Sequence, residues 1–238
     1  MTVTREQRVA ATFVELADTL VDDFDVIDFL QTLALRCTEL LAVDAAGIML
    51  ADAGGALQVA ASSVDEARMV ELYELQNDEG PCLDCFRTGA AVVNVADPGR
   101  RWPRFHAHAT AAGFPSTHAL PMQLRGQVIG TLNLFLTTRR ALDETAVHLG
   151  QALADVATIA LIQQRSRHEA EMLAHQLQAA LTSRILIEQA KGILAERNGI
   201  TPDAAFAILR RRARTDQIRL ADLAQRVIQD PGRLAFGG

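Results

Sequence analysis

Lysine is almost absent from this chain of 238 residues: Lys191 is the single lysine among 23 cationic residues. Cysteine is also scarce, and Cys37, Cys82 and Cys85 are an odd number and too few for a disulfide scaffold. The start of the chain, MTVTREQR, lacks the apolar core of an export signal. Together these absences predict a protein of the reducing cytoplasm.

Long apolar runs are missing as well, because Asp, Arg or Glu interrupts every candidate before it reaches the roughly 20 residues of a membrane span. We therefore expect no membrane partner. Hydrophobic residues make up 49% and charged residues 22% of the chain, which is ordinary for a soluble globular protein. The length allows one large domain or two smaller ones, each with its own core.

Charge is unevenly distributed along the chain. Residues 181–229 carry nine cationic and five anionic residues, a net charge of +4, whereas the whole chain has −6 and the remainder therefore −10. A basic segment on an acidic protein indicates a nucleic acid or another polyanion as partner. The alternative is a solvated arginine face without a partner.

The acidic part alternates helical and extended patterns. Helices are expected at 5–20, 25–41, 65–76, within 97–113 and from about 142; strands are expected at 43–52, 57–62, 91–96, 116–124 and 128–136. The stretch 77–89 looks irregular. The order predicts an α+β sensor-like domain with about five strands in one antiparallel sheet and flanking helices, over residues 1–165.

A helical segment leads out of this domain, with an apolar residue at every fourth position: Leu173, Leu177, Leu181 and Ile185. Such a stripe favours packing against a partner helix, so we expect a coiled-coil linker at 166–180 and a homodimer. A single solvated connecting helix is the alternative.

Three helices account for the basic part, 181–230, followed by a flexible tail at 231–238. Gly199 is expected to cap the first helix, and Thr201 with Pro202 to begin the second. One stripe of the first helix, Leu186, Ile187, Ala190, Ile193 and Leu194, is expected to form the core with Phe206, Leu209 and Ala213 of the second. Lys191 shares a helix edge with Arg184, and Arg210 and Arg214 lie one turn apart, so cations of neighbouring helices can converge.

The motifs of this part, IEQAKGIL (187–194), ERNGI (196–200), DAAFAILR (203–210) and the run 213–224, closely resemble the ANTAR domain, a bacterial RNA-binding output module. Two positions depart from the family pattern: Ala195 stands where Met is usual, and Gln217 where Asn is usual. The first affects packing, and the second affects a polar contact before the third helix.

The resemblance implies a dimeric protein that binds paired RNA stem-loops in nascent leader transcripts and prevents terminator formation. Carried over by position, it makes Ala190, Lys191, Gly192, Arg210 and Arg214 candidate RNA contacts. Charge and helix geometry add Arg184, Arg212 and Arg219. Recognition through hairpin loops is physically reasonable, because the A-form major groove is too narrow for side chains.

The acidic part resembles a GAF domain over about residues 8–162, from its element order and from EGPCLDCFRTG (79–89), AVVNVAD (91–97) and RRWPRF (100–105). This resemblance implies a small-ligand sensor. GAF relatives bind cyclic nucleotides, tetrapyrroles, gases through haem, or no known ligand, and no residue here selects among these cases, so no cofactor is assigned.

Cys82 and Cys85 form a CxxC motif that suggests redox chemistry or a metal site. Zinc needs four ligands, and no second CxxC supplies them, while His106 and His108 point apart on a helix. A low thiol pKa at a helix N-terminus is the condition for redox activity, whereas half-buried structural thiols are the ordinary case. His118 is expected to be packed or solvated.

These observations favour a dimeric, RNA-binding transcription antitermination regulator that is not an enzyme, with a GAF domain gating the ANTAR domain in response to an unknown ligand. One alternative is a GAF-fold redox enzyme of the methionine sulfoxide reductase type, with Cys82 and Cys85 as nucleophile and resolving thiol. Another is a dimeric signalling scaffold that binds no RNA.

Overall fold

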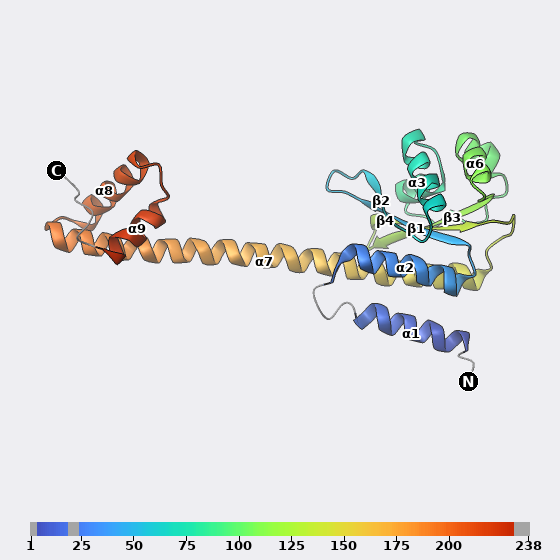
Figure 1. Cartoon of the computed structure of the whole chain (residues 1–238), viewed down its shortest axis with the longest axis horizontal. Helices are drawn as coiled ribbons and strands as arrows, with labels where there is room; N and C mark the ends of the chain where they lie inside the picture. Colours follow the sequence, from blue (N-terminus) through green and yellow to red (C-terminus); the bar gives the residue numbers. More distant parts are fainter. Residues whose placement is uncertain (1–3, 19–23, 231–238) are drawn as a thin grey trace. The chain divides into compact units, whose positions relative to one another are not determined.

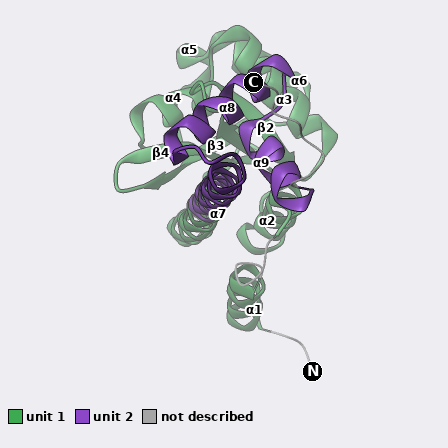
Figure 2. Cartoon of the chain, turned by 90° about the vertical axis from the view of Figure 1, so that its left-hand side faces the viewer, with its two compact units in different colours: residues 1–165 green, residues 166–238 purple. Residues whose placement is uncertain are grey.

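A computed structural model describes residues 4–18 and 24–230 of the chain, which divides into two compact units, Met1–Arg165 and Ser166–Gly238 (Figure 2). The expected flexible tail at 231–238 and the expected end of the first helix at residue 20 lie outside the described residues.

Unit 1 is built on a four-stranded antiparallel sheet in the order β2-β1-β4-β3. The strands are β1 (Ala45–Ala51), β2 (Leu57–Ser62), β3 (Ser116–Leu124) and β4 (Gln127–Leu136). Two hairpins form it, and the β3–β4 turn places Arg125 and Gly126 at positive φ, as a tight turn of two residues requires. A Cβ on Gly130 would collide with the Met49 carbonyl oxygen, so glycine allows β4 to pair closely with β1.

One face of the sheet is covered by two helices, α2 (Val26–Leu41) and the first part of α7 (Glu144–Asn198) (Figure 1). Asp25 caps α2 by accepting the backbone N–H groups of Ile27 and Asp28. The core on this face is made of aliphatic side chains such as Leu33 of α2, Leu132 of β4 and Leu153 of α7, none of them exposed. An ion pair of 2.9 Å between Arg36 and Glu15 joins α2 to α1 (Arg5–Asp18).

On the other face lie α3 (Asp65–Asn77), α4 (Pro81–Thr88), the short α5 (Pro98–Arg101) and α6 (Pro103–Ala111), of which Figure 1 shows α3 and α6. Their core is more aromatic and includes Trp102, Phe105, Phe114 and Phe135.

Two of the expected local structures are wrong. The stretch 77–89 is not irregular, because Pro81 begins a helix there and Gly89, at φ 67°, ends it. Residues 91–96 form no strand: Val92 makes a single bridge to Ala119, and Asn94, at φ 51°, leaves the extended conformation. The sheet of the described residues therefore has four strands where about five were expected.

Unit 2 contains the C-terminal part of α7, α8 (Pro202–Thr215) and α9 (Leu220–Gln229). Gly199, at φ 61°, ends α7, and the Thr201 hydroxyl accepts the Ala204 N–H to cap α8, with Pro202 as its first residue. The core joins side chains of all three helices: Ala190, Leu194, Ala205, Leu209, Ala213, Leu223, Ala224 and Val227. The expected fold class, an α+β domain followed by a long helix and a three-helix domain, is confirmed.

One described helix, α7, has the length and apolar composition of a membrane span, since Asp155 is the only charged residue between 145 and 164. Asp155 interrupts this run, as expected, although one charge does not remove the helix from the candidates by length and composition. Part of this stretch packs into the core of unit 1, where Leu153, Ala154, Ala157 and Ala160 are 0–1% exposed, whereas Ile159 is 38% exposed.

Candidate nucleic-acid interface

Packing in the core of unit 2 determines which of the expected RNA-contact residues are exposed. Ala190 is 0% exposed and packs in the three-helix core. A side chain without exposed surface cannot contact RNA, so the assignment of Ala190 as a contact residue is corrected to a packing role. Gly192, two positions further on, is exposed, and a Cβ added there would meet no described atom within 4 Å.

Lys191 lies against the surface of the bundle rather than extending into solvent. Its side chain is 15% exposed, and its Nζ donates to both carboxylate oxygens of Glu188 at 3.0 and 2.8 Å. The same Nζ stands 5.5 Å from the ring centroid of Phe206 on α8. The single lysine is therefore held by one carboxylate and one aromatic face, with its charge at the surface.

Phe206 is half-buried and does not belong to the core, contrary to the expectation. The core positions of α8 are instead Ala205, Leu209 and Ala213. The Arg210 guanidinium carbon lies 5.9 Å from the Phe206 ring centroid, so two cations from different helices share one aromatic ring. Sequence reasoning missed this role, although the spacing of Phe206 and Arg210 at i and i+4 was a usable signal.

Beside this group, an open hollow of about 310 Å³ lies at the α8–α9 junction. Its charged and polar lining comes from Arg210, Arg214 and Gln217, and its apolar lining from Ala213, Ile218 and Leu220. Gln217 adopts φ 53°, which turns the chain from α8 toward α9. The hollow thus places two guanidinium groups and an amide around a small apolar floor.

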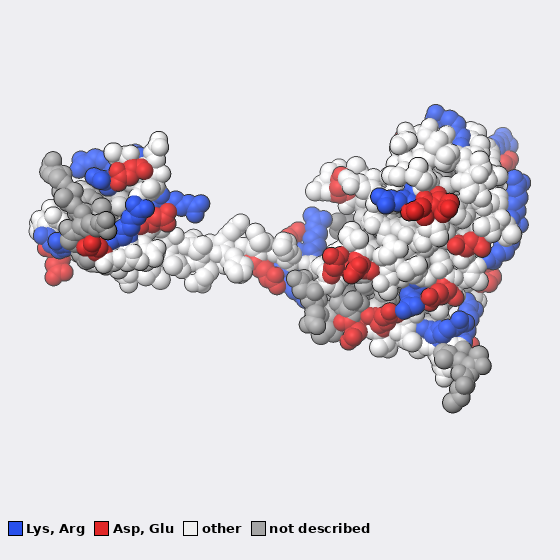
Figure 3. Space-filling view, in the orientation of Figure 1, with Lys and Arg blue, Asp and Glu red and all other residues white. Residues whose placement is uncertain are grey.

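The remaining expected contacts are not part of this cluster. Arg212 pairs with Asp216 at 2.6 Å and lies about 200° around α8 from Arg210, on the opposite side of the helix. Arg184 is exposed two turns before Lys191, and Arg219 is exposed at the start of α9 outside the lining of the hollow. Figure 3 shows Lys and Arg side chains gathered on the visible face of unit 2, interleaved with acidic groups.

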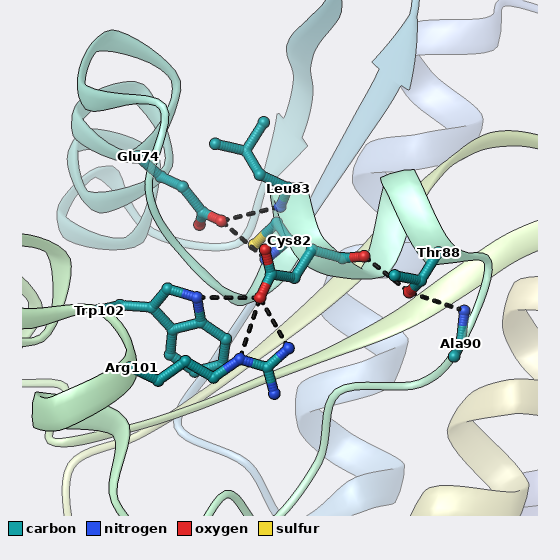
Figure 4. Close-up of polar contacts among 8 residues, drawn as sticks. Glu74, Cys82, Leu83, Thr88, Ala90, Arg101 and Trp102 are labelled. Atoms are coloured by element: carbon teal, nitrogen blue, oxygen red, sulfur yellow. Dashed lines mark hydrogen bonds and ion pairs between the residues drawn. The ribbon is translucent and has the colours of Figure 1, made fainter.

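Cys82 and Cys85 occupy the first turns of α4, where Figure 4 shows Glu74 of α3 directed at the helix start. One Glu74 oxygen accepts the backbone N–H groups of Cys82 at 2.7 Å and Leu83 at 3.0 Å. This carboxyl group occupies the helix N-terminus, and burial raises the pKa of Cys85 to about 12 and that of Cys82 well above its ordinary value. Both thiols are therefore protonated at neutral pH, the opposite of the condition for redox activity.

The histidines show no shared ligand geometry. His108 stacks on Tyr73 at 3.8 Å between ring centroids, and His118 is buried with Nδ1 accepting the Asn94 N–H at 3.1 Å. No group of three or more metal-ligating side chains comes together among the described residues.

Two buried carboxyl groups were not anticipated from the sequence. Glu71 and Glu74 are both 0% exposed, and the Asn133 amide donates to Glu71 at 2.6 Å. Burial raises the pKa of Glu71 to about 8 and that of Glu74 to about 7. A Cβ on Gly47 would collide with the Glu71 carboxyl, and one on Gly80 with that of Glu74. These glycines, which make room for the carboxyls, were the signal in the sequence.

Comparison with known families accounts for both units. A sequence model of the ANTAR domain matches residues 175–228, and one of the GAF domain matches residues 25–162. No protein of curated function matches the chain.

Solved structures of low identity share the fold of unit 1. A GAF domain of a phosphoenolpyruvate-protein phosphotransferase from Coxiella burnetii is 12% identical, with a TM-score of 0.54 over 70% of this chain and 99% of that one. The corresponding Acinetobacter domain is 15% identical, with a TM-score of 0.52 over 71% and 99%. A free methionine-R-sulfoxide reductase from Neisseria meningitidis is 17% identical, with a TM-score of 0.51 over 68% and 91%.

Proposed function

Because the chain belongs to the GAF family and carries an ANTAR domain at residues 175–228, we propose that it binds stem-loops in nascent leader transcripts and thereby prevents transcription termination. The GAF domain is the sensor of this regulator, and α7 connects it to the RNA-binding unit. The protein acts in the cytoplasm, where nascent transcripts are made.

The observation that carries the proposal is the group formed by Lys191, Phe206 and Arg210. Unpaired bases stack on aromatic rings and on guanidinium planes, and cations beside the ring neutralise the adjoining phosphates. The hollow lined by Arg214 and Gln217 lies next to this group and offers an amide to a base edge. Such a surface suits the splayed bases of a hairpin loop better than a duplex, whose bases are stacked inside.

A second copy of the chain completes the proposed RNA-binding protein. Five large apolar side chains of α7 are 49–58% exposed within unit 2: Met172, Leu173, Leu177, Leu181 and Ile185. We expect four of them, from Leu173 to Ile185, to pack against the same stripe of a second copy as a coiled coil. Two ANTAR domains in one dimer match two hairpins in one transcript.

The redox alternative draws support from the methionine sulfoxide reductase that shares the fold, but that likeness concerns the fold alone. Buried thiols whose pKa values are raised by burial are poor nucleophiles. The scaffold alternative leaves the cations around Phe206 without a purpose. We therefore favour RNA binding over both.

The test is the affinity of the full chain for an RNA carrying two hairpins. We expect Lys191→Ala with Arg210→Ala to weaken binding by at least about tenfold and to lower the slope of log affinity against log salt by about 2. Phe206→Leu is expected to weaken binding with little change in that slope, because it removes stacking but no charge.

The matched control removes two other exposed cations of unit 2, Arg197→Ala with Arg226→Ala. Equal losses of RNA affinity in the control and the test pair would mean that only the net charge of unit 2 matters. Unchanged affinity in the test pair would refute the proposed site. Sedimentation of each variant establishes that the oligomeric state is the same.

A further inference from the structure

Unit 1 contains a hollow of about 350 Å³ where β3 begins, beside the edge of the aromatic core, which Val95 also contacts. Its walls are residues 94–97, the start of α5, His106 of α6, the first residues of β3 and the loop 139–141. The polar side chains that bear on its chemistry are Asp97, His106, His118, Arg139 and Arg140.

His118 is the buried polar group of the hollow. It is 4% exposed, and its Nδ1 accepts the backbone N–H of Asn94, so the proton of the neutral ring resides on Nε2. Within the described part of the chain that Nε2 has no hydrogen-bond partner. A buried donor without an acceptor is costly, so a bound water or the polar group of a ligand is needed to complete this position.

The ring remains a neutral donor at physiological pH. Burial, and secondarily the Arg140 charge, lower the pKa of His118 to about 4. The Nε2–H is thus available to an acceptor throughout the neutral range.

The charges around the hollow favour an anion. Arg139 and Arg140 are both exposed at its rim, and Arg140 also donates to the Ala42 carbonyl oxygen. Arg139 forms no ion pair or hydrogen bond with any other described residue. Asp97 is the one carboxylate of the lining, and its Oδ1 accepts the Arg100 N–H at 3.0 Å. Two guanidinium groups against one carboxylate leave a net positive charge.

We propose that this hollow is a binding site for a small molecule bearing an oxyanion, a phosphate or carboxylate group. The oxyanion accepts the Nε2–H of His118 and pairs with the Arg139 and Arg140 guanidinium groups. Charge-assisted hydrogen bonds of this kind are the strong ones, and arginine matches both oxyanions through its planar fork.

The site is connected to the start of α7 by hydrogen bonds. His118 holds the backbone of Asn94, and the Asn94 side chain donates to the Leu142 carbonyl at 3.0 Å and accepts the Leu142 N–H at 2.9 Å. Leu142 stands two residues before α7. An occupant of the hollow therefore contacts the loop that leads into this helix. A signalling role for this contact rests on the proposed function, whereas anion binding in the hollow does not.

The binding test uses the full chain titrated with inorganic phosphate and, separately, with acetate, against sodium chloride of equal ionic strength. The readouts are the imidazole nitrogen shifts of His118 and the amide shift of Asn94. We expect a saturable shift at both positions with at least one of the two anions, and the anion bound more tightly identifies the oxyanion class.

Arg139→Gln is the first variant, because its side chain contributes no described contact to the fold, and we expect it to weaken binding by roughly tenfold. His118→Phe, which keeps a planar ring but removes both ring nitrogens, is expected to weaken it similarly. Arg125→Gln, an exposed arginine of the β3–β4 turn, is the matched control and is expected to bind as the unaltered chain does.

Shifts that do not saturate with either anion, or that are equal in Arg139→Gln and Arg125→Gln, overturn the proposal. RNA affinity is measured on the same samples without added phosphate or acetate. A protein that binds no RNA can therefore still bind the anion. Failure of the RNA proposal is thus distinguishable from failure of the anion proposal.

Discussion

Glu71 and Glu74 are two buried carboxyl groups that link the stability of this fold to pH. The Asn133 amide bonds one Glu71 oxygen, while the second Glu71 oxygen, the second Glu74 oxygen and the Asn133 carbonyl oxygen have no partner within the described residues. Burial without full pairing disfavours the charged form, which is why the pKa values of both groups are raised. The folded state therefore holds protons that the unfolded chain releases near pH 4.5.

This linkage has a definite sign. Because the pKa of Glu71 is raised to about 8, its contribution to stability is complete below the unfolded value of 4.5 and is lost as pH rises toward 8. We expect Glu71→Gln, which cannot ionise, to become more stable relative to the unaltered chain by roughly 2 kcal/mol between about pH 6 and about pH 8. Urea unfolding at both pH values measures this difference.

The control for that measurement is Glu66→Gln, an exposed carboxylate on the same helix. A difference between Glu71→Gln and the unaltered chain that does not grow with pH would mean that Glu71 is ionised in the folded state.

Phe206 and Ala190 mark the limit of sequence reasoning for single residues. Periodicity places Phe206 beside Leu209 and Ala213, and hydrophobicity ranks phenylalanine above alanine for the core. The three helices approach closely through small residues, however, so Ala190, Ala205 and Ala224 are buried and the phenylalanine ring lies at the edge. The converging cations could be predicted from their spacing; the ring between them required the packing.

At the scale of elements, prediction succeeded where the signal was local. Thr201, Pro202 and Gly199 define the α7–α8 junction by capping, and 57–62 and 116–124 are strands as expected. It failed at α4 although Pro81 and Gly89 are local start and stop signals, because the carboxylate that accepts the first N–H groups comes from Glu74, six residues before Gly80. It failed at 91–96 because the left-handed conformation of Asn94 is held by His118 and Leu142, both distant in sequence.

The exposed glycine of α7 offers the sharpest test of an element. Gly192 lies on the helix face of Leu181 and Ile185, and a Cβ there meets no described atom within 4 Å. Alanine should therefore stabilise the helix by about 1 kcal/mol. We expect Gly192→Ala to raise the free energy of unfolding at low protein concentration and to weaken dimerisation, because the added methyl occupies the face of the partner helix.

Denaturation at several protein concentrations separates these two effects. Weakened binding of two-hairpin RNA by a Gly192→Ala protein whose dimer is intact would instead assign the open position to RNA approach. Ala195→Gly, which lowers helix propensity at a half-buried position packed against the core of unit 2, serves as the comparison.

For the whole molecule, the uncovered stripe of α7 is the main unsatisfied feature of the single chain. No Lys, Arg, Asp or Glu occurs from Met172 to Ser183. We expect Leu177→Glu with Leu181→Glu to convert the protein to a monomer by placing like charges in the dimer seam. Sedimentation equilibrium of the full chain measures this.

His175→Glu with Ala179→Glu adds two charges at the same spacing on the opposite side of the helix and is expected to leave the dimer intact. A monomeric unaltered chain at micromolar concentration would contradict the coiled coil. Loss of two-hairpin RNA binding in the monomeric variant, with single-hairpin binding retained, would support one hairpin per ANTAR domain.

The three thiols are distributed in a way that the sheet makes useful. Cys37 lies in the aliphatic core on one side, and Cys82 and Cys85 lie in the aromatic core on the other, each at most 1% exposed. Each side of the sheet thus contains at least one buried thiol. That thiol is protected from alkylation while the helices cover the sheet and becomes reactive when they separate from it. The order in which the three cysteines are alkylated during unfolding therefore shows which side of the sheet opens first.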